Sequence, residues 1–160
     1  MVRFTMIAGA AILLGACNGS EAEQAVPDEA AVQRLMEQTV QPQAEIFWNS
    51  AGTIIDETGE HDLAPTTDEG WERTRQAAAN IADSARLLMT PTYADGRGED
   101  WMQFSQSLVE IAQRAEQAAA NQDVDAVFEI GGTMYNVCTA CHQVYISEDV
   151  PPAAGAEQAS

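Results

Sequence analysis

The stretch Asp123–Tyr145, DVDAVFEIGGTMYNVCTACHQVY, decides the architecture predicted for this 160-residue chain. Its apolar positions recur at the spacing of one face of an α-helix. Cys138, Cys141 and His142 continue that face, because they stand at i, i+3 and i+4. The predicted stripe comprises Val127, Phe128, Gly131, Met134, Tyr135, Cys138, Cys141, His142 and Tyr145. The stretch therefore predicts a core-facing helix whose end presents two thiols and an imidazole together.

The segment Cys138-Thr139-Ala140-Cys141-His142 has the C-x-x-C-H spacing that marks attachment of a c-type haem. The thiols of Cys138 and Cys141 would add across the two haem vinyl groups. The imidazole of His142 would bind the iron from one side and leave the opposite side to another residue. We therefore predict one covalent haem c per chain.

Three other interpretations of the cysteine pair stay open from the sequence. A thioredoxin-like site would need a βαβ setting, and nothing in the chain reads as alternating strand and helix. A zinc site would need further ligands, and His61 and Cys17 are the remaining His and Cys residues. A disulfide across a three-residue gap on a helix would be strained.

Acidic residues dominate the charge of the chain. There are 25 Asp and Glu against 7 Arg and no Lys, which gives a formal net charge of −18 at pH 7. Such a surface repels nucleic acid and anionic membranes, so we expect no nucleic-acid partner. A redox partner that docks electrostatically should be basic, although a strongly solvated, aggregation-resistant surface is the simpler interpretation.

Residues 1–17 resemble a bacterial lipoprotein signal. A short apolar run, Phe4–Leu14, is too short for a permanent membrane span. It is followed by Gly-Ala-Cys, so Cys17 is expected to be lipidated and to anchor the exported chain to a membrane. The alternative is an ordinary signal peptide cut near Ala16.

The segments on either side of the predicted domain are polar or rich in small residues. Residues 18–27, NGSEAEQAVP, are predicted to be a flexible tether. Asn18 stands where an Asp would resemble an inner-membrane retention signal, which slightly favours the outer membrane. Residues 149–160 are predicted to be a disordered tail. Together these features predict a periplasmic, membrane-anchored lipoprotein.

Apolar periodicity predicts three further amphipathic helices in residues 28–121. Pro42 should kink the first of these helices or split it in two. A long connection is expected at Thr53–Pro65, and a capping box from Thr66 to Glu69 should open the second helix, which Pro91 stops. The predicted buried stripes are Val32, Leu35, Met36, Thr39, Gln43, Ile46 and Phe47; Trp71, Thr74, Ala78, Ile81, Ala85 and Leu88; and Trp101, Phe104, Leu108, Ile111, Ala112, Ala115 and Ala119.

Four such helices favour an all-α fold, an antiparallel up-down-up-down four-helix bundle over residues 28–148 with haem near the end of the last helix. The start of the first helix would then lie beside the end of the fourth, and Met36 and His142 would differ by only about 5 Å in height. A thioether is a good sixth ligand to haem iron, so Met36 is the candidate. Core packing is the alternative for Met36, and His61 is a rival ligand.

The motif near the chain's end, followed by the aromatic Tyr145, and the Arg34-Leu35-Met36 segment are similar to the cytochrome c′ family. The resemblance covers roughly residues 28–146. Low-spin members resemble this chain in carrying a Met on the first helix and move electrons, whereas high-spin members leave the iron open and bind NO or CO. The chain departs from the family at Ile146, where a basic residue is frequent soon after the aromatic, and at Val32, where many members carry Arg.

These observations predict an exported monohaem cytochrome that carries electrons. Alternatives are a five-coordinate haem protein that binds NO or CO and a haem-free periplasmic scaffold lipoprotein with a thiol pair. We expect no enzyme, because the chain shows no Ser-His-Asp set, no paired catalytic carboxylates and no phosphate-binding Gly loop. The resemblance also implies a homodimer as one expected state. Arg34, Arg86 and Arg97 are candidates to bind the haem propionates.

Overall fold

The computed structural model describes residues 28–146, of which 75% are helical. This agrees with the predicted all-α class. The elements are α1 (Glu29–Leu35), η1 (Met36–Val40), α2 (Gln41–Trp48), β1 (Thr53–Asp56), β2 (Gly59–Asp62), α3 (Asp68–Leu88), α4 (Pro91–Ala94), α5 (Glu99–Ala120) and α6 (Val124–Tyr145). The predicted signal with Cys17, the tether and the tail lie outside the described residues. Within 28–146, none of the helices combines the length and apolar character needed to cross a membrane.

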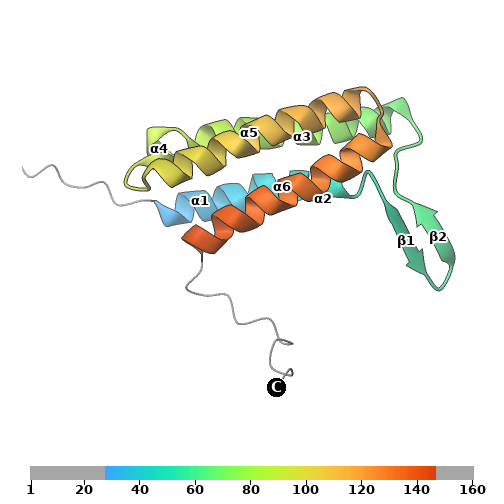
Figure 1. Ribbon diagram of the computed structural model, residues 1–160, viewed down its shortest axis with the longest axis horizontal. Coiled ribbons are helices and arrows are strands. Elements are labelled where there is room, and N and C mark those ends of the chain that lie inside the picture. The colour runs from blue at the N-terminus through green and yellow to red at the C-terminus, as the bar shows by residue number, and fades with distance from the viewer. Residues whose placement is uncertain (1–27, 147–160) are drawn as a thin grey trace, which may run out of the picture.

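The long helices lie side by side along one axis, and the β-hairpin projects from one end (Figure 1). α3 packs most extensively against α5, α5 packs against α6, and α2 contacts both α3 and α6. The blue start of α1 and the red end of α6 lie at the same end of the molecule (Figure 1). The ends of the sequence that carry Met36 and the C-x-x-C-H motif are thereby brought together.

The first helical segment is continuous through Pro42, so the proline does not split it in two. Instead, residues Met36–Val40 form a π turn, in which the Gln41 N–H donates to the Met36 carbonyl five residues back. Proline lacks an N–H and its ring presses on the carbonyl four residues earlier, so the wider turn accommodates it. The π turn adds a residue to the helix and shifts the buried face. Val40 and Ala44 are buried where Thr39 and Gln43 were predicted.

The predicted long connection at Thr53–Pro65 contains an antiparallel hairpin. β1 pairs with β2 in the register Thr53↔Asp62, Ile54↔His61, Ile55↔Glu60 and Asp56↔Gly59. Every residue of both strands is exposed. Without a buried face, the strands carry no alternation of apolar and polar residues, so the pattern that identifies a strand was absent from the sequence.

Most predicted helix ends are correct to within a residue or two. Asp123 caps α6 by accepting a hydrogen bond from the Ala126 N–H at 3.0 Å, and Asn121 is the C-cap of α5. The cap of α3 is Thr67 rather than Thr66, and its hydroxyl accepts from the Gly70 N–H at 3.1 Å. Pro91 lies beyond the end of α3 and opens the short helix α4.

The core lies between the α3–α5 pair and the two remaining helical segments. All six predicted stripe residues of α3 are buried. Alanine-rich faces on α3 and α5 allow these two helices to approach closely. The predicted stripe of α6 is wrong at Phe128 and Tyr135, which are 64% and 57% exposed, and at His142, which is also exposed. The buried face instead follows Val127, Ile130, Gly131 and Met134, a narrower i, i+3, i+4, i+7 stripe.

Replacement of Phe47 by alanine should lower the free energy of unfolding by about 3–5 kcal/mol, because the completely buried ring would leave a cavity. Phe128→Ala is the matched control, since this ring is mostly exposed and its loss should cost within about 0.5 kcal/mol. Urea unfolding followed by circular dichroism measures both. Equal losses in the two variants would contradict the packing described here.

Candidate functional site

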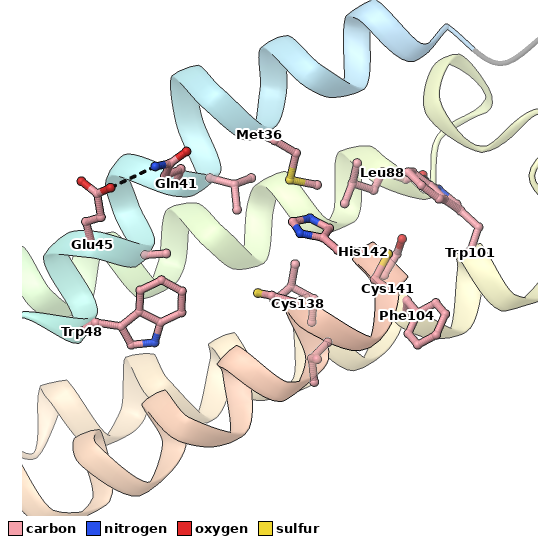
Figure 2. Close-up of a pocket in the computed structure, with 15 residues that line it drawn as sticks. Met36, Gln41, Glu45, Trp48, Leu88, Trp101, Phe104, Cys138, Cys141 and His142 are labelled. Atoms are coloured by element: carbon pink, nitrogen blue, oxygen red, sulfur yellow. Dashed lines mark hydrogen bonds between the residues drawn. The ribbon is translucent and has the colours of Figure 1, made fainter. Parts of the chain in front are cut away.

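A cavity of about 260 Å³ separates the C-x-x-C-H motif from the first helical segment (Figure 2). The motif side of the cavity belongs to α6, the opposite wall to η1 and α2, and the floor to α3 and α5. Its lining is largely apolar, and the amide of Gln41 donates to Glu45 at 3.1 Å at one edge. The lining residues are Met36, Val40, Gln41, Ala44, Glu45, Trp48, Leu88, Trp101, Phe104, Ser105, Leu108, Val137, Cys138, Cys141 and His142.

A second hollow of about 570 Å³ adjoins the first at the end of the molecule where α1 begins and α6 ends. It is more polar, with Glu29 and Arg97 among the residues that line it. The two hollows share four lining residues: Met36, Trp101, Cys141 and His142. An apolar cavity and a charged one therefore meet at the predicted iron ligands.

The structure brings four of the predicted site residues to one place. Cys138 and Cys141 are partly buried, and Cys138 packs against the core. Figure 2 shows the side chains of Met36 and His142 entering the cavity from opposite walls, Met36 from the first helical segment and His142 from α6. His61 is not among the residues lining either hollow. It lies on the exposed hairpin, where its Nε2 is 3.2 Å from Asp56 Oδ1.

The two thiols are free and are poor candidates for thiol–disulfide exchange. Burial raises the pKa of both, and it raises the pKa of Cys141 to about 11, with the nearby Cys138 adding to the shift and Arg97 opposing it. Exchange chemistry requires a thiolate, which a lowered pKa would favour. Within residues 28–146 no three His, Cys, Asp or Glu side chains are grouped to hold a metal ion, so the zinc interpretation gains no support.

The π turn explains how Met36 and Trp48 share one wall of the cavity. The two residues are twelve positions apart, so in a regular α-helix at about 100° per residue they would point about 120° apart. The extra residue of the π turn removes about 100° of this difference. π turns occur frequently at functional sites. Pro42 was the sequence signal for this irregularity, although it was interpreted as a kink or break.

Trp48 closes the cavity at the far end from Arg97 and is held there by α6. Its indole N–H donates to the Gly131 carbonyl at 3.1 Å, and its ring meets Tyr135 edge-on with centroids 6.1 Å apart. A Cβ on Gly131 would lie 3.2 Å from the Trp48 ring, whereas one on Gly132 would meet nothing within 4 Å. A side chain on Gly131 would therefore force the Trp48 ring to move by a few tenths of an ångström.

The two neighbouring glycines of α6 provide a test of this contact. Gly132→Ala should stabilise the protein by about 0.5–1 kcal/mol, because alanine is the better helix former and has open space there. Gly131→Ala gains the same propensity but must displace Trp48, so it should be clearly less stable than Gly132→Ala. Thermal unfolding compares the two variants, and equal stabilisation would contradict the described position of Trp48.

The structure separates the three arginines proposed for the haem propionates. Arg86 is exposed and pairs with Asp83 at 2.6 Å, and Arg34 is also exposed. Neither is among the residues that line the hollows. The side chain of Arg97 is only 3% exposed and lines the second hollow, and its Nη2 has no hydrogen-bond partner within residues 28–146. A buried guanidinium beside the motif, with one nitrogen that makes no hydrogen bond, fits a ligand that carries carboxylates.

These side chains fit the chemistry of a covalent haem. The two thiols lie on α6, and the His142 imidazole and the Met36 thioether enter the cavity from opposite walls. Apolar side chains line the middle, and the Arg97 guanidinium lies at the polar end. The four residues that the sequence predicted as haem ligands line the first cavity, and Arg97, one of its propionate candidates, lines the second. The sequence did not identify Trp48 or the other wall residues as parts of the site. In comparisons with known proteins, no protein family, curated protein or solved structure matches this chain.

Proposed function

We propose that the chain is an exported c-type cytochrome with one haem, bonded covalently to Cys138 and Cys141, and that it carries electrons. His142 would bind the iron on one side and Met36 on the other. The observation that carries the proposal is that Met36 lines both hollows opposite the C-x-x-C-H motif. When bound, the haem would supply one-electron redox chemistry. We do not propose an enzymatic activity.

The protein residues would position the haem and exclude water from it. Leu88, Phe104 and Leu108 contribute apolar side chains to the first cavity, and Trp48 closes one end. An apolar pocket would limit how far the surroundings rearrange when the charge of a bound haem changes, because few mobile dipoles would lie close to it. The imidazole of His142 and the thioether of Met36 come from different helical segments. Packing of these segments would therefore fix the two ligands relative to each other.

The proposed architecture is an up-down-up-down four-helix bundle resembling that of the cytochrome c′ family. The helical segment Glu29–Trp48, α3, α5 and α6 would be its four members. We further propose that the mature chain is a periplasmic lipoprotein anchored through Cys17, with the outer membrane slightly favoured. Its redox partner would carry a basic docking surface, since the chain has a net charge of −18. A homodimer stays a prediction.

The alternative is a five-coordinate haem that binds NO or CO in the same cavity. The absorption spectrum of the reduced protein, recorded before and after addition of CO, separates the two functions. Sharp low-spin bands that CO leaves unchanged are expected for His–Met ligation and electron transfer. Ready conversion to a CO complex would overturn the ligation by Met36 and favour gas binding. A colourless protein would favour the haem-free scaffold.

A further inference from the structure

Arg97 is a buried cation that is only partly compensated. Its Nη2 lies 3.1 Å from Oε1 of Glu29, close enough for an ion pair, yet it has no hydrogen-bond partner within the described residues. The side chain of Arg97 is 3% exposed, whereas that of Glu29 is 73% exposed. Removing a guanidinium from water is costly unless its donors are satisfied. The guanidinium of Arg97 could therefore bind a further negatively charged hydrogen-bond acceptor.

The guanidinium is also held so that it cannot turn towards water. Its Nε donates to the Tyr93 carbonyl at 2.9 Å, and its Cζ lies 4.2 Å from the centre of the Trp101 ring. The hydroxyl of Tyr145 donates to the Arg97 carbonyl at 3.1 Å, which ties this loop to the end of α6. The backbone is turned inward by glycines on both sides, Gly96 at φ +79° and Gly98 at φ +84°. Arg97 is thus fixed in direction.

Arg97 lines the same hollow as Cys141, His142 and Met36. This hollow is the polar end of the site, and a haem attached at Cys138 and Cys141 has two carboxylates of its own. We propose that Arg97 binds a haem propionate and that Glu29 occupies the propionate's place in the haem-free chain. The inference rests on the proposed function, because it requires a haem at the motif.

Exchange of one carboxylate for the other leaves the charge balance of Arg97 unchanged. Glu29 lies in the first turn of α1 and is largely exposed, so it can move into water at little cost. It remains at the N-terminal end of a helix, where a negative charge is favourable. A propionate placed in the hollow could make the charge-assisted hydrogen bond that Nη2 lacks.

Two measurements on the haem-bound protein test the contact between Arg97 and the propionate. They are the reduction potential and the propionate bending band in the resonance Raman spectrum. Arg97→Gln should shift the equilibrium towards the ferric form by about tenfold, a potential about 59 mV lower, because the propionate charge is no longer neutralised. It should also shift the propionate band. Arg97→Lys keeps the charge without the planar fork, so its potential should fall less while its band still moves.

Arg86→Gln is the matched control, because it removes the same charge from an exposed position outside both hollows. It should leave the band unchanged and shift the equilibrium by less than about twofold, since an exposed charge is screened by water and salt. Arg97→Gln and Arg86→Gln could give the same potential and the same band in proteins that carry covalent haem. In that case Arg97 does not bind the propionate, while the proposed function stands. Absence of covalent haem from the unmodified protein would instead overturn both.

Glu29→Gln tests the exchange. In the haem-bound protein, Glu29 should have left Arg97, so the variant should retain the propionate band and a potential within about twofold in the ferrous-to-ferric equilibrium. A rise in potential comparable in size to the fall in Arg97→Gln would show that Glu29 remains paired with Arg97. That result would overturn the exchange.

Discussion

A chain in which Cys138 and Cys141 are both replaced by serine is expected to emerge from the cytochrome-maturation pathway with no covalent haem. A serine hydroxyl does not add to a vinyl group as a thiol does, so neither bond to the porphyrin can form. Both thiols line the cavity with His142. Serine is close to cysteine in size, so the double replacement should leave the helix and the cavity walls in place. Haem staining of a denaturing gel measures the loss, because only covalent haem survives denaturation.

Ala140→Ser controls for a change within the same turn of α6. It introduces a hydroxyl between the two cysteines without touching either thiol, so this variant should stain as strongly as the unmodified chain. Each single serine variant should retain one thioether bond and stain weakly. Full staining of the double variant would show that the motif does not attach the haem.

Replacement of Met36 by alanine should convert the iron from low spin to high spin and open it to CO. Met36 is the only thioether among the residues lining the two hollows, so within the described site no other thioether can take its place. The reduction potential should also fall, because a thioether ligand raises it. Absorption spectra of the oxidised and reduced protein, with a CO titration, measure these changes.

Met102→Ala is the matched control for this substitution. Met102 lies on α5, is 40% exposed and does not line either hollow. Its removal should leave the spectrum and the response to CO unchanged. If Met36→Ala also leaves both unchanged, Met36 only packs in the core, and the five-coordinate gas-binding function gains the support that electron transfer loses.

The helices could be predicted from the sequence because their signals are local. Asp123 and Asn121 mark helix ends through capping, and the buried stripe of α3 follows the 3.6-residue period. The C-x-x-C-H motif was equally readable, since Cys138, Cys141 and His142 lie within five consecutive residues of one helix. The prediction that Met36 lies near the motif required one further assumption. The start of the first helix had to lie beside the end of the last helix.

The features that the sequence did not predict depend on tertiary contacts or carry no periodic signal. The hairpin has no buried face, so no alternation reveals it. The π turn shifts the buried face by one residue, which is why Val40 and Ala44 are buried instead of Thr39 and Gln43. Arg97 lies in a loop between α4 and α5, and it contacts Tyr93, Trp101 and Tyr145 from three separate elements. No local pattern distinguishes it from an exposed arginine.

The intact mass of the mature protein tests the central claim most directly. The protein should be purified from cells competent to mature c-type cytochromes and measured under denaturing conditions. Our account predicts a coloured protein whose mass equals the processed polypeptide plus one haem, together with acyl chains on Cys17. A colourless protein whose mass is explained by polypeptide and lipid alone would contradict it.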